Sequence, residues 1–223
     1  MFRLLESEYI HRRRGYNRTV MIKDNYDRQI DYMRISVTDR CNLRCRYCMP
    51  EDIDFIPHDD ILRYEEMLRL VKIFAKQGIR KIKITGGEPL VRNGCVDFMK
   101  QLKAVEGIEN VTITTNGVLL DKYLPELIEA GVDGINISLD SLDREKYAYI
   151  TGRDEFDRVW NGIENAIAAG LKVKLNCVPL REYNADEIFP NRIFQKFEHR
   201  INHCKQEYGD KTQSGRIVHS AQA

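Results

Sequence analysis

Residues 81–89 have the sequence KIKITGGEP, in which polar and apolar side chains alternate and then give way to a pair of glycines. The alternation of Ile82 and Ile84 with polar residues predicts a β-strand over 81–85, because successive side chains of a strand point to opposite faces. Upstream, apolar residues at positions 67, 70, 71 and 74 have helical spacing, and Gly78 ends that helix. The stretch therefore predicts a helix, a short connection and a strand in succession.

The same succession recurs on both sides of this stretch. Periodicity predicts further strands at residues 32–37, 111–114, 134–138 and 171–176, and further helices at 95–105, 120–130 and 156–167. Five strands that alternate with helices over short connections indicate parallel βα units, and therefore an α/β fold. Right-handed crossovers would curve such a series into a barrel or a doubly wound sheet, with functional groups at the carboxyl ends of the strands.

The regular pattern occupies residues 31–188. Residues 1–30 lack periodicity and are predicted to form an N-terminal arm, and residues 189–223 are predicted to form a divergent or disordered tail. The chain has 35 Lys and Arg against 34 Asp and Glu, so its charge gives no indication of nucleic acid. It has no apolar run of transmembrane length and no secretory signal pattern, so we expect a cytoplasmic protein without a membrane partner.

Three of the six cysteines, Cys41, Cys45 and Cys48, fall within eight residues. A disulfide scaffold would be small, secreted and evenly crosslinked, and this chain is none of these. Iron–sulfur clusters take Cys thiolates, normally four per cubane, so three ligands on one short loop would leave the fourth iron open to a substrate or cofactor. A structural zinc site is the alternative, but it normally has four ligands in paired CxxC spacing, and no second pair is present.

The remaining cysteines stand apart from this loop. Cys95 and Cys177 fall in a predicted helix and strand, where we expect small core residues rather than ligands. Cys204 lies beside His203, but no partner at ligand spacing accompanies the pair.

The cysteine segment resembles the signature of the radical S-adenosylmethionine superfamily. The resemblance implies a (βα)6-type barrel, of which five units are recognisable here, with a 4Fe–4S cluster and S-adenosylmethionine as cofactors. Its open iron would be chelated by the amino and carboxylate groups of S-adenosylmethionine. One electron from the cluster would then release a 5′-deoxyadenosyl radical that abstracts hydrogen.

The resemblance also assigns cofactor contacts. Tyr47 corresponds to an aromatic residue beside the adenine, with simple loop packing as the alternative. Gly86, Gly87 and Glu88 correspond to the element that meets the methionine amino group. We expect the glycines to let the backbone approach a ligand and offer unpaired N–H and C=O groups. An ordinary tight turn is the alternative for this element.

Finer matches resemble the GTP 3′,8-cyclase family of molybdenum cofactor biosynthesis, a family of lyases. They extend in order over roughly residues 26–188 and comprise YMRISVTDRCNLRCRYCMP (32–50), KITGGEPLVR (83–92), TTNGV (114–118), NISLDSL (136–142) and TGR (151–153). In that family the radical takes hydrogen from the ribose 3′ carbon of GTP, and the sugar radical attacks guanine C8. The product continues to cyclic pyranopterin monophosphate.

The resemblance places substrate and cofactor contacts at strand ends. It implies that GTP is bound by Arg34, Lys83, Thr114 and Lys174, and that Ser138 contacts S-adenosylmethionine. GTP carries about four negative charges near neutral pH, and these cations suit its phosphates. Lys83 stands where many relatives have Arg, so a point charge replaces a bidentate fork. Ordinary polarity at a strand edge is the alternative for each of these residues.

The sequence departs from the family after about residue 188. The family holds a second 4Fe–4S cluster on three C-terminal cysteines and has a sixth barrel strand, and neither is recognisable here. We therefore expect a truncated or divergent member. An incomplete barrel would leave a sheet edge that a partner has to cover.

We expect GTP as the substrate, a reductant protein for the cluster, and a homodimer. Two alternatives remain open: a radical S-adenosylmethionine enzyme acting on a different substrate, and a non-catalytic fragment that binds a cluster. We assign no chemistry to Asp140 and expect it to cap the turn that follows it.

Overall fold

The computed structural model describes residues 22–49 and 53–188. The predicted C-terminal tail, most of the predicted N-terminal arm, and the pair His203 and Cys204 lie outside these ranges. Within them, no helix is long and apolar enough to cross a membrane.

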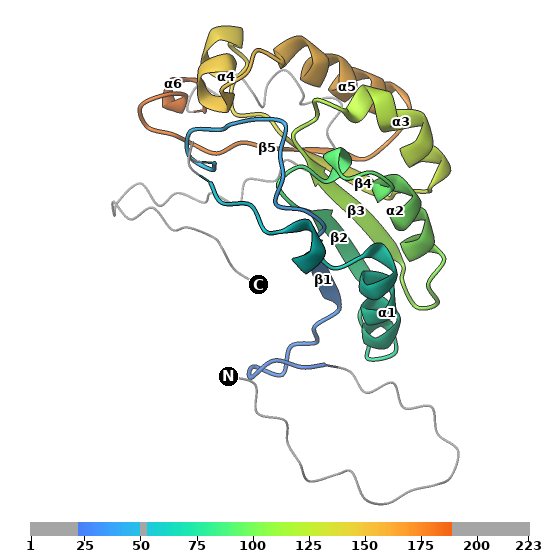
Figure 1. Cartoon of the computed structure of the whole chain (residues 1–223). Coiled ribbons are helices and arrows are strands. Elements are labelled where there is room, and N and C mark those ends of the chain that lie inside the picture. Colours follow the sequence, from blue (N-terminus) through green and yellow to red (C-terminus); the bar gives the residue numbers. More distant parts are fainter. Residues whose placement is uncertain (1–21, 50–52, 189–223) are drawn as a thin grey trace, which may run out of the picture.

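A parallel sheet of five strands forms the centre of the described structure (Figure 1). Its spatial order follows the sequence, and all neighbouring strands are parallel. The strands are β1 (Tyr32–Ser36), β2 (Lys81–Thr85), β3 (Asn110–Thr115), β4 (Gly134–Ser138) and β5 (Val173–Asn176). Within the described residues the sheet is therefore an open partial barrel, as the family resemblance implied, whereas the βα pattern alone had left a doubly wound sheet open.

The two faces of the sheet differ because side chains alternate along each strand. Isoleucines of β2, β3 and β4 on one face are completely buried beneath the helices. These helices are α1 (Tyr64–Ala75), α2 (Cys95–Lys103), α3 (Leu120–Glu129) and α5 (Phe156–Ala168). The other face carries polar side chains, among them Arg34, Lys83 and Lys174. The sheet is thus stabilised by apolar packing on the side of the helices, while its other face carries polar groups.

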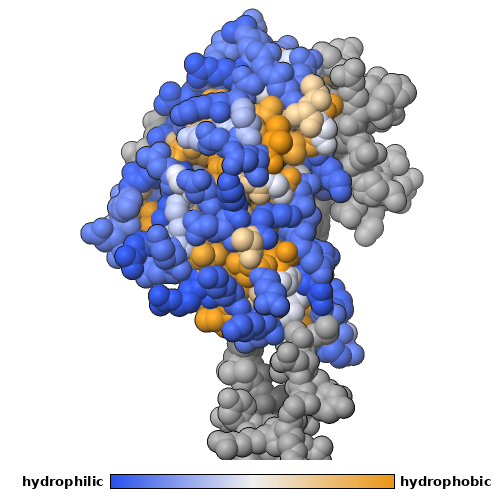
Figure 2. Space-filling view, turned by 90° about the vertical axis from the view of Figure 1, so that its right-hand side faces the viewer, coloured by the Kyte–Doolittle hydropathy of each residue, from blue (hydrophilic) through white to orange (hydrophobic). Residues whose placement is uncertain are grey.

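Viewed from the side of the helices, the surface is mostly hydrophilic, with small separate apolar areas (Figure 2). Such scattered apolar residues are normal on a folded surface. The exposed apolar side chains include Leu70 and Ile73 on α1 and Ile128 on α3.

Four short elements were not predicted from the sequence. They are the 3-10 turns η1 (His58–Asp60) and η2 (Pro89–Val91), helix α4 (Arg144–Thr151) and helix α6 (Ala185–Ile188). Helix α4 is capped at its N-terminus by Asp143, whose carboxylate accepts the Lys146 N–H at 3.0 Å, and at its C-terminus by Gly152, whose φ is +72°. These two residues are ordinary helix boundaries and could have indicated α4 from the sequence.

Residues 22–30, which belong to the predicted arm, form a turn before β1. Lys23 and Gln29 make an antiparallel bridge, and the Ile22 N–H donates to the Gln77 carbonyl oxygen at 3.3 Å. This turn therefore packs against the connection between α1 and β2.

Candidate active site

The three clustered cysteines lie on the loop that follows the carboxyl end of β1, named here the cysteine loop (residues 39–49). Cys41 and Cys45 are half-buried, Cys48 is exposed, and none of them forms a disulfide. Burial raises the pKa of Cys45 to about 12, and the nearby Asp140 and the other two thiols add to this effect. The three sulfurs are therefore close enough to affect one another electrostatically.

The cysteine loop supplies thiol donors, for which the sequence left two kinds of metal site open. No three Cys, His, Asp or Glu side chains in the described ranges converge on a single metal ion, so the loop does not have the form of a zinc site. In a 4Fe–4S cubane each thiolate binds its own iron, so the cysteines need not converge on one point. Three free thiols on one loop therefore fit a cluster better than a single ion.

The glycine pair after β2 packs directly against the start of the cysteine loop. A Cβ atom on Gly87 would lie 2.4 Å from the Arg40 carbonyl oxygen, and one on Gly86 would lie 2.6 Å from the Thr38 carbonyl oxygen. The Gly87 N–H donates to Thr38 O at 2.6 Å, and the Glu88 N–H donates to Arg40 O at 2.8 Å. The N–H groups of Gly87 and Glu88 are therefore paired within the protein and do not face a ligand, while contact of the other backbone groups with a ligand stays a prediction. Gly86 and Gly87 allow two backbones to meet.

Glu88 is completely buried and connects β2 to the end of β3. Its Oε1 accepts the Thr115 hydroxyl at 2.8 Å and the Leu90 N–H at 3.0 Å, and its Oε2 accepts the Asn116 N–H at 2.6 Å. Burial raises the pKa of Glu88, and these three hydrogen bonds oppose the shift. Both carboxylate oxygens are thus bound within the protein. A contact of Glu88 with S-adenosylmethionine stays a prediction.

Asn116, in the TTNGV segment after β3, reaches the first cysteine. Its Nδ2 lies 3.6 Å from the Cys41 Sγ and donates to the Asn42 Oδ1 at 2.7 Å. The Leu43 N–H also points to the Cys41 Sγ, at 3.4 Å. Burial raises the pKa of Cys41, and the Leu43 and Asn116 hydrogen bonds oppose this. Donors aimed at a sulfur are suited to stabilising a thiolate.

Tyr47 extends from the cysteine loop to Asp140, which follows β4. The Tyr47 hydroxyl donates to Asp140 Oδ2 at 2.7 Å, while 43% of the Tyr47 surface remains exposed. The other oxygen, Oδ1, accepts the Val178 N–H at 2.9 Å. The sequence predicted that Asp140 caps the turn that follows it. This prediction is wrong, because both of its oxygens bind distant segments.

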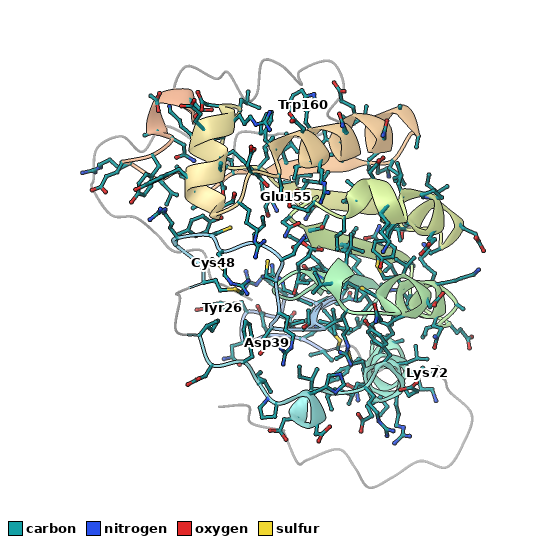
Figure 3. The ribbon with its side chains drawn as sticks, turned by 45° about the horizontal axis from the view of Figure 1, so that its top comes forward. Tyr26, Asp39, Cys48, Lys72, Glu155 and Trp160 are labelled. Carbon is teal, nitrogen blue, oxygen red and sulfur yellow. The ribbon has the colours of Figure 1, made fainter. Side chains whose placement is uncertain are left out.

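The carboxyl end of α4 holds the middle of the cysteine loop. The Arg44 and Arg46 N–H groups donate to the carbonyl oxygens of Thr151 and Ile150 at 2.9 and 3.0 Å. A Cβ on Gly152 would lie 2.7 Å from the Arg44 carbonyl oxygen. Figure 3 shows Cys48 on the loop beside this helix. Sequence reasoning singled out the TGR segment without predicting this structural role.

The predicted substrate residues share the polar face of the sheet. Arg34 and Lys83 are opposite one another on β1 and β2, and Thr114 and Lys174 each lie opposite Asn136 of β4. Burial lowers the pKa of Lys83, and the charges of Arg34 and Lys174 lower it further. The structure thus places the three cations on one face of the sheet, where Arg34 and Lys174 both influence the pKa of Lys83.

Three further residues considered from the sequence differ in their surroundings. Ser138 ends β4 opposite Asn176 on the same polar face. Cys95 is 3% exposed and lies in the core, as predicted. Cys177 is only half-buried and follows β5, where its thiol contacts the Asp140 carbonyl oxygen at 3.6 Å. The prediction that Cys177 is a core residue is therefore only partly confirmed.

The fold and the cysteine loop define the class of this protein. The family model of the radical SAM superfamily matches residues 35–189, and the chain belongs to this superfamily. The solved structure of native anSMEcpe with bound AdoMet and Kp18Cys peptide shares the fold. Its TM-score is 0.62 at 19% identity, covering 84% of this chain and 55% of that one.

More similar sequences narrow the relationship. The chain is 52% identical over 178 residues to the GTP 3′,8-cyclase of Thermodesulfovibrio yellowstonii, covering 78% of this chain and 55% of that protein. It is 45% identical over 190 residues to the human molybdenum cofactor biosynthesis protein 1, covering 82% of this chain and 30% of that protein. The chain thus spans about half the length of the bacterial relative.

Proposed function

We propose that this chain carries the radical-generating and phosphate-binding part of a GTP 3′,8-cyclase of molybdenum cofactor biosynthesis. The observation that carries the proposal is the position of the cysteine loop, at the carboxyl edge of a sheet whose polar face holds three neighbouring cations. The similarity to GTP 3′,8-cyclases from several bacteria supports the choice of substrate.

The cofactor part of the proposal rests on the loop and its supports. Cys41, Cys45 and Cys48 would hold a 4Fe–4S cluster, and Tyr47, Gly86, Gly87, Glu88 and Ser138 would form the S-adenosylmethionine site. When bound, the two cofactors supply a 5′-deoxyadenosyl radical. The protein holds the loop in place through a backbone hydrogen bond from Glu88 to Arg40 and through backbone hydrogen bonds to the end of α4.

The substrate part rests on the polar face of the sheet. Arg34, Lys83 and Lys174 would bind the triphosphate of GTP, because three cations close together repel one another and gain from an anion. Thr114 lies on the same face, and its hydroxyl would donate a hydrogen bond to the substrate. These residues orient GTP below the cysteine loop and take no part in moving electrons.

The proposal includes a cellular context. A reductant protein would supply the electron to the cluster in the cytoplasm, and a homodimer would cover the outer edge of the sheet. Neither nucleic acid nor a membrane surface is part of the proposal.

The test is anaerobic reconstitution of the full chain with iron and sulfide, followed by metal analysis and an assay for 5′-deoxyadenosine with and without GTP. We expect about four irons per chain and more 5′-deoxyadenosine when GTP is present. Cys45→Ala should lose iron and product together. Cys95→Ala, a buried cysteine of the core, is the matched control and should keep both.

Each contrary outcome identifies the part of the proposal that fails. Zinc in place of iron, or unchanged iron in Cys45→Ala, would refute the cluster assignment. Product formation that GTP does not stimulate would favour an enzyme acting on another substrate. A full complement of iron without any 5′-deoxyadenosine would favour a non-catalytic fragment.

A further inference from the structure

We propose that Asp140 is a positioning residue that fixes the ring of Tyr47 for contact with the adenosyl group of S-adenosylmethionine. The inference rests on the proposed function, since it assigns a role within the same cofactor site. It starts from a buried carboxylate for which the sequence predicted only a turn cap, a role that the structure contradicts.

The burial of Asp140 requires an explanation. The residue is 3% exposed, and no ion pair within the described ranges includes it. A buried carboxylate without a cation is costly unless hydrogen bonds satisfy it. Its two oxygens accept from the Tyr47 hydroxyl at 2.7 Å and from the Val178 N–H at 2.9 Å. The carboxylate therefore gains its stabilisation by joining the cysteine loop to the end of β5.

The position of Asp140 is itself fixed by its neighbours. Asn184 is completely buried and donates through Nδ2 to the Asp140 carbonyl oxygen at 2.6 Å and to the Val178 carbonyl oxygen at 2.9 Å. The Leu180 N–H in turn donates to the Asn184 Oδ1 at 2.7 Å. Because the acceptor is held from several sides, the Tyr47 hydroxyl meets a rigid partner.

Tyr47 is held at both ends. Its hydroxyl is bound to Asp140, and its backbone lies between Arg46, whose N–H donates to Ile150 O at 3.0 Å, and Cys48, whose N–H donates to Cys45 O at 3.0 Å. With 43% of the residue still exposed, the ring presents surface while its orientation stays fixed. An aromatic ring that is already ordered loses little rotamer freedom when a planar group stacks on it.

A planar ligand that meets this ring belongs to the chemistry of the cofactor loop. Tyr47 lies directly before Cys48, so a group chelated near the cysteines by one end reaches Tyr47 with its other parts. S-adenosylmethionine has this form, with a chelating amino acid end and a planar adenine. Stacking on an aromatic ring contributes about threefold to tenfold in affinity, and this is the effect expected from Asp140 acting through Tyr47.

The experiment measures binding of S-adenosylmethionine to the reconstituted full chain by isothermal titration calorimetry, together with iron content. Tyr47→Phe keeps the ring and removes the hydroxyl, and Asp140→Ala removes its acceptor. Each should weaken binding about threefold to tenfold with iron unchanged. The double variant should bind no more weakly than the weaker single variant, because both changes break one link.

Two further variants separate positioning from a general structural effect. Asp140→Asn can accept the Val178 N–H and donate to the Tyr47 hydroxyl oxygen, so it should restore most of the affinity lost in Asp140→Ala. Asp143→Asn, at the N-terminus of α4, is the matched control and should bind like the wild type. If Asp140→Ala does not fold, the affinity of Tyr47→Phe for S-adenosylmethionine, compared with that of the wild type, decides whether the link between Tyr47 and Asp140 matters.

Unchanged affinity in Tyr47→Phe, or losses that add in the double variant, would overturn the role of Asp140. A wild-type chain that carries the cluster but binds no S-adenosylmethionine would instead overturn the proposed function. The two failures are therefore distinguishable in one set of titrations.

Discussion

The buried carboxylate of Glu88 gives the most direct test of how the cysteine loop is held. Replacing it with Gln keeps the size of the side chain and exchanges one oxygen for an amide donor. In the protein both oxygens face donors: Thr115 and Leu90 on one side, and the Asn116 N–H on the other. In either orientation of the Gln amide, at least one buried N–H group then faces another donor.

The magnitude follows from the cost of a buried donor without an acceptor, which is about 1–3 kcal/mol. Glu88→Gln should therefore lower the free energy of unfolding by about 1–3 kcal/mol, and Glu88→Ala, which removes the acceptor of all three donors, by about 3–6 kcal/mol. With a urea dependence of about 2 kcal/mol per molar, the Gln variant should unfold at roughly 0.5–1.5 M lower urea. Domains are stable by only about 5–15 kcal/mol, so the Ala variant should be close to unfolding at room temperature.

The assay is urea unfolding of the chain, followed by circular dichroism and by the fluorescence of its one tryptophan, Trp160. Glu129→Gln is the matched control, because Glu129 is an exposed carboxylate paired with Lys100 on the surface. The urea midpoint of Glu129→Gln should equal that of the wild type. A midpoint for Glu88→Gln equal to that of Glu129→Gln would refute the reasoning.

Three further predictions concern the polar face and the cysteine loop. Lys83→Met should weaken GTP binding about tenfold or more. Because the pKa of Lys83 is lowered, its ammonium group is charged at low pH and loses its proton at a lower pH than an ordinary lysine does. Wild-type GTP affinity measured by calorimetry should therefore fall as the pH rises through that lowered pKa. Gly87→Ala forces the Arg40 carbonyl away, which should lower stability by about 1–3 kcal/mol and reduce the iron retained per chain. Asn116→Asp removes an N–H donor from the Cys41 sulfur and adds negative charge, which should shift the cluster midpoint potential to more negative values in a spectroscopic redox titration.

Each of these predictions has a control on the same chain. Lys83→Arg stays charged at all relevant pH values and should abolish the pH dependence, and a persistent dependence would contradict the assignment. Gly170→Ala introduces a Cβ with nothing within 4 Å, so it should retain iron although its φ of +80° is unfavourable. Asn165→Asp makes the same substitution on α5, far along the chain from the cysteines, and should leave the midpoint potential unchanged.

The sequence predicted most of the regular structure because the helices and strands that cover the core have a clear periodic spacing of apolar residues. The strands at 81–85 and 134–138 were predicted with their observed bounds, since apolar residues alternate with polar ones or glycine there. Helix α4 was missed because only Tyr147, Ile150 and Thr151 are buried in it and its apolar stripe is narrow. Periodicity detects elements that cover a core, and α4 mainly supports a loop.

The contacts of the site were harder to predict for a different reason. The residue types were recognisable, but Glu88 binds residues 27 and 28 positions away, and Asp140 binds residues 93 and 38 positions away. A local pattern contains no information about such partners. The sequence therefore indicated candidate residues for the site without showing which of them contact one another, and it gave no indication of the contacts of Asp140.

These contacts separate the site into two parts that respond differently to substitution. Gly87, Asn116 and Gly152 all contact the cysteine loop itself, so changes there should reduce iron retention before they affect any substrate. Lys83 and Arg34 project from the middle of β2 and β1 and make no hydrogen bond to the loop in the described structure. Changes at these cations should therefore alter GTP affinity at full iron content. A Lys83 variant that lost iron together with GTP binding would show that the two parts are coupled through the sheet, contrary to this view.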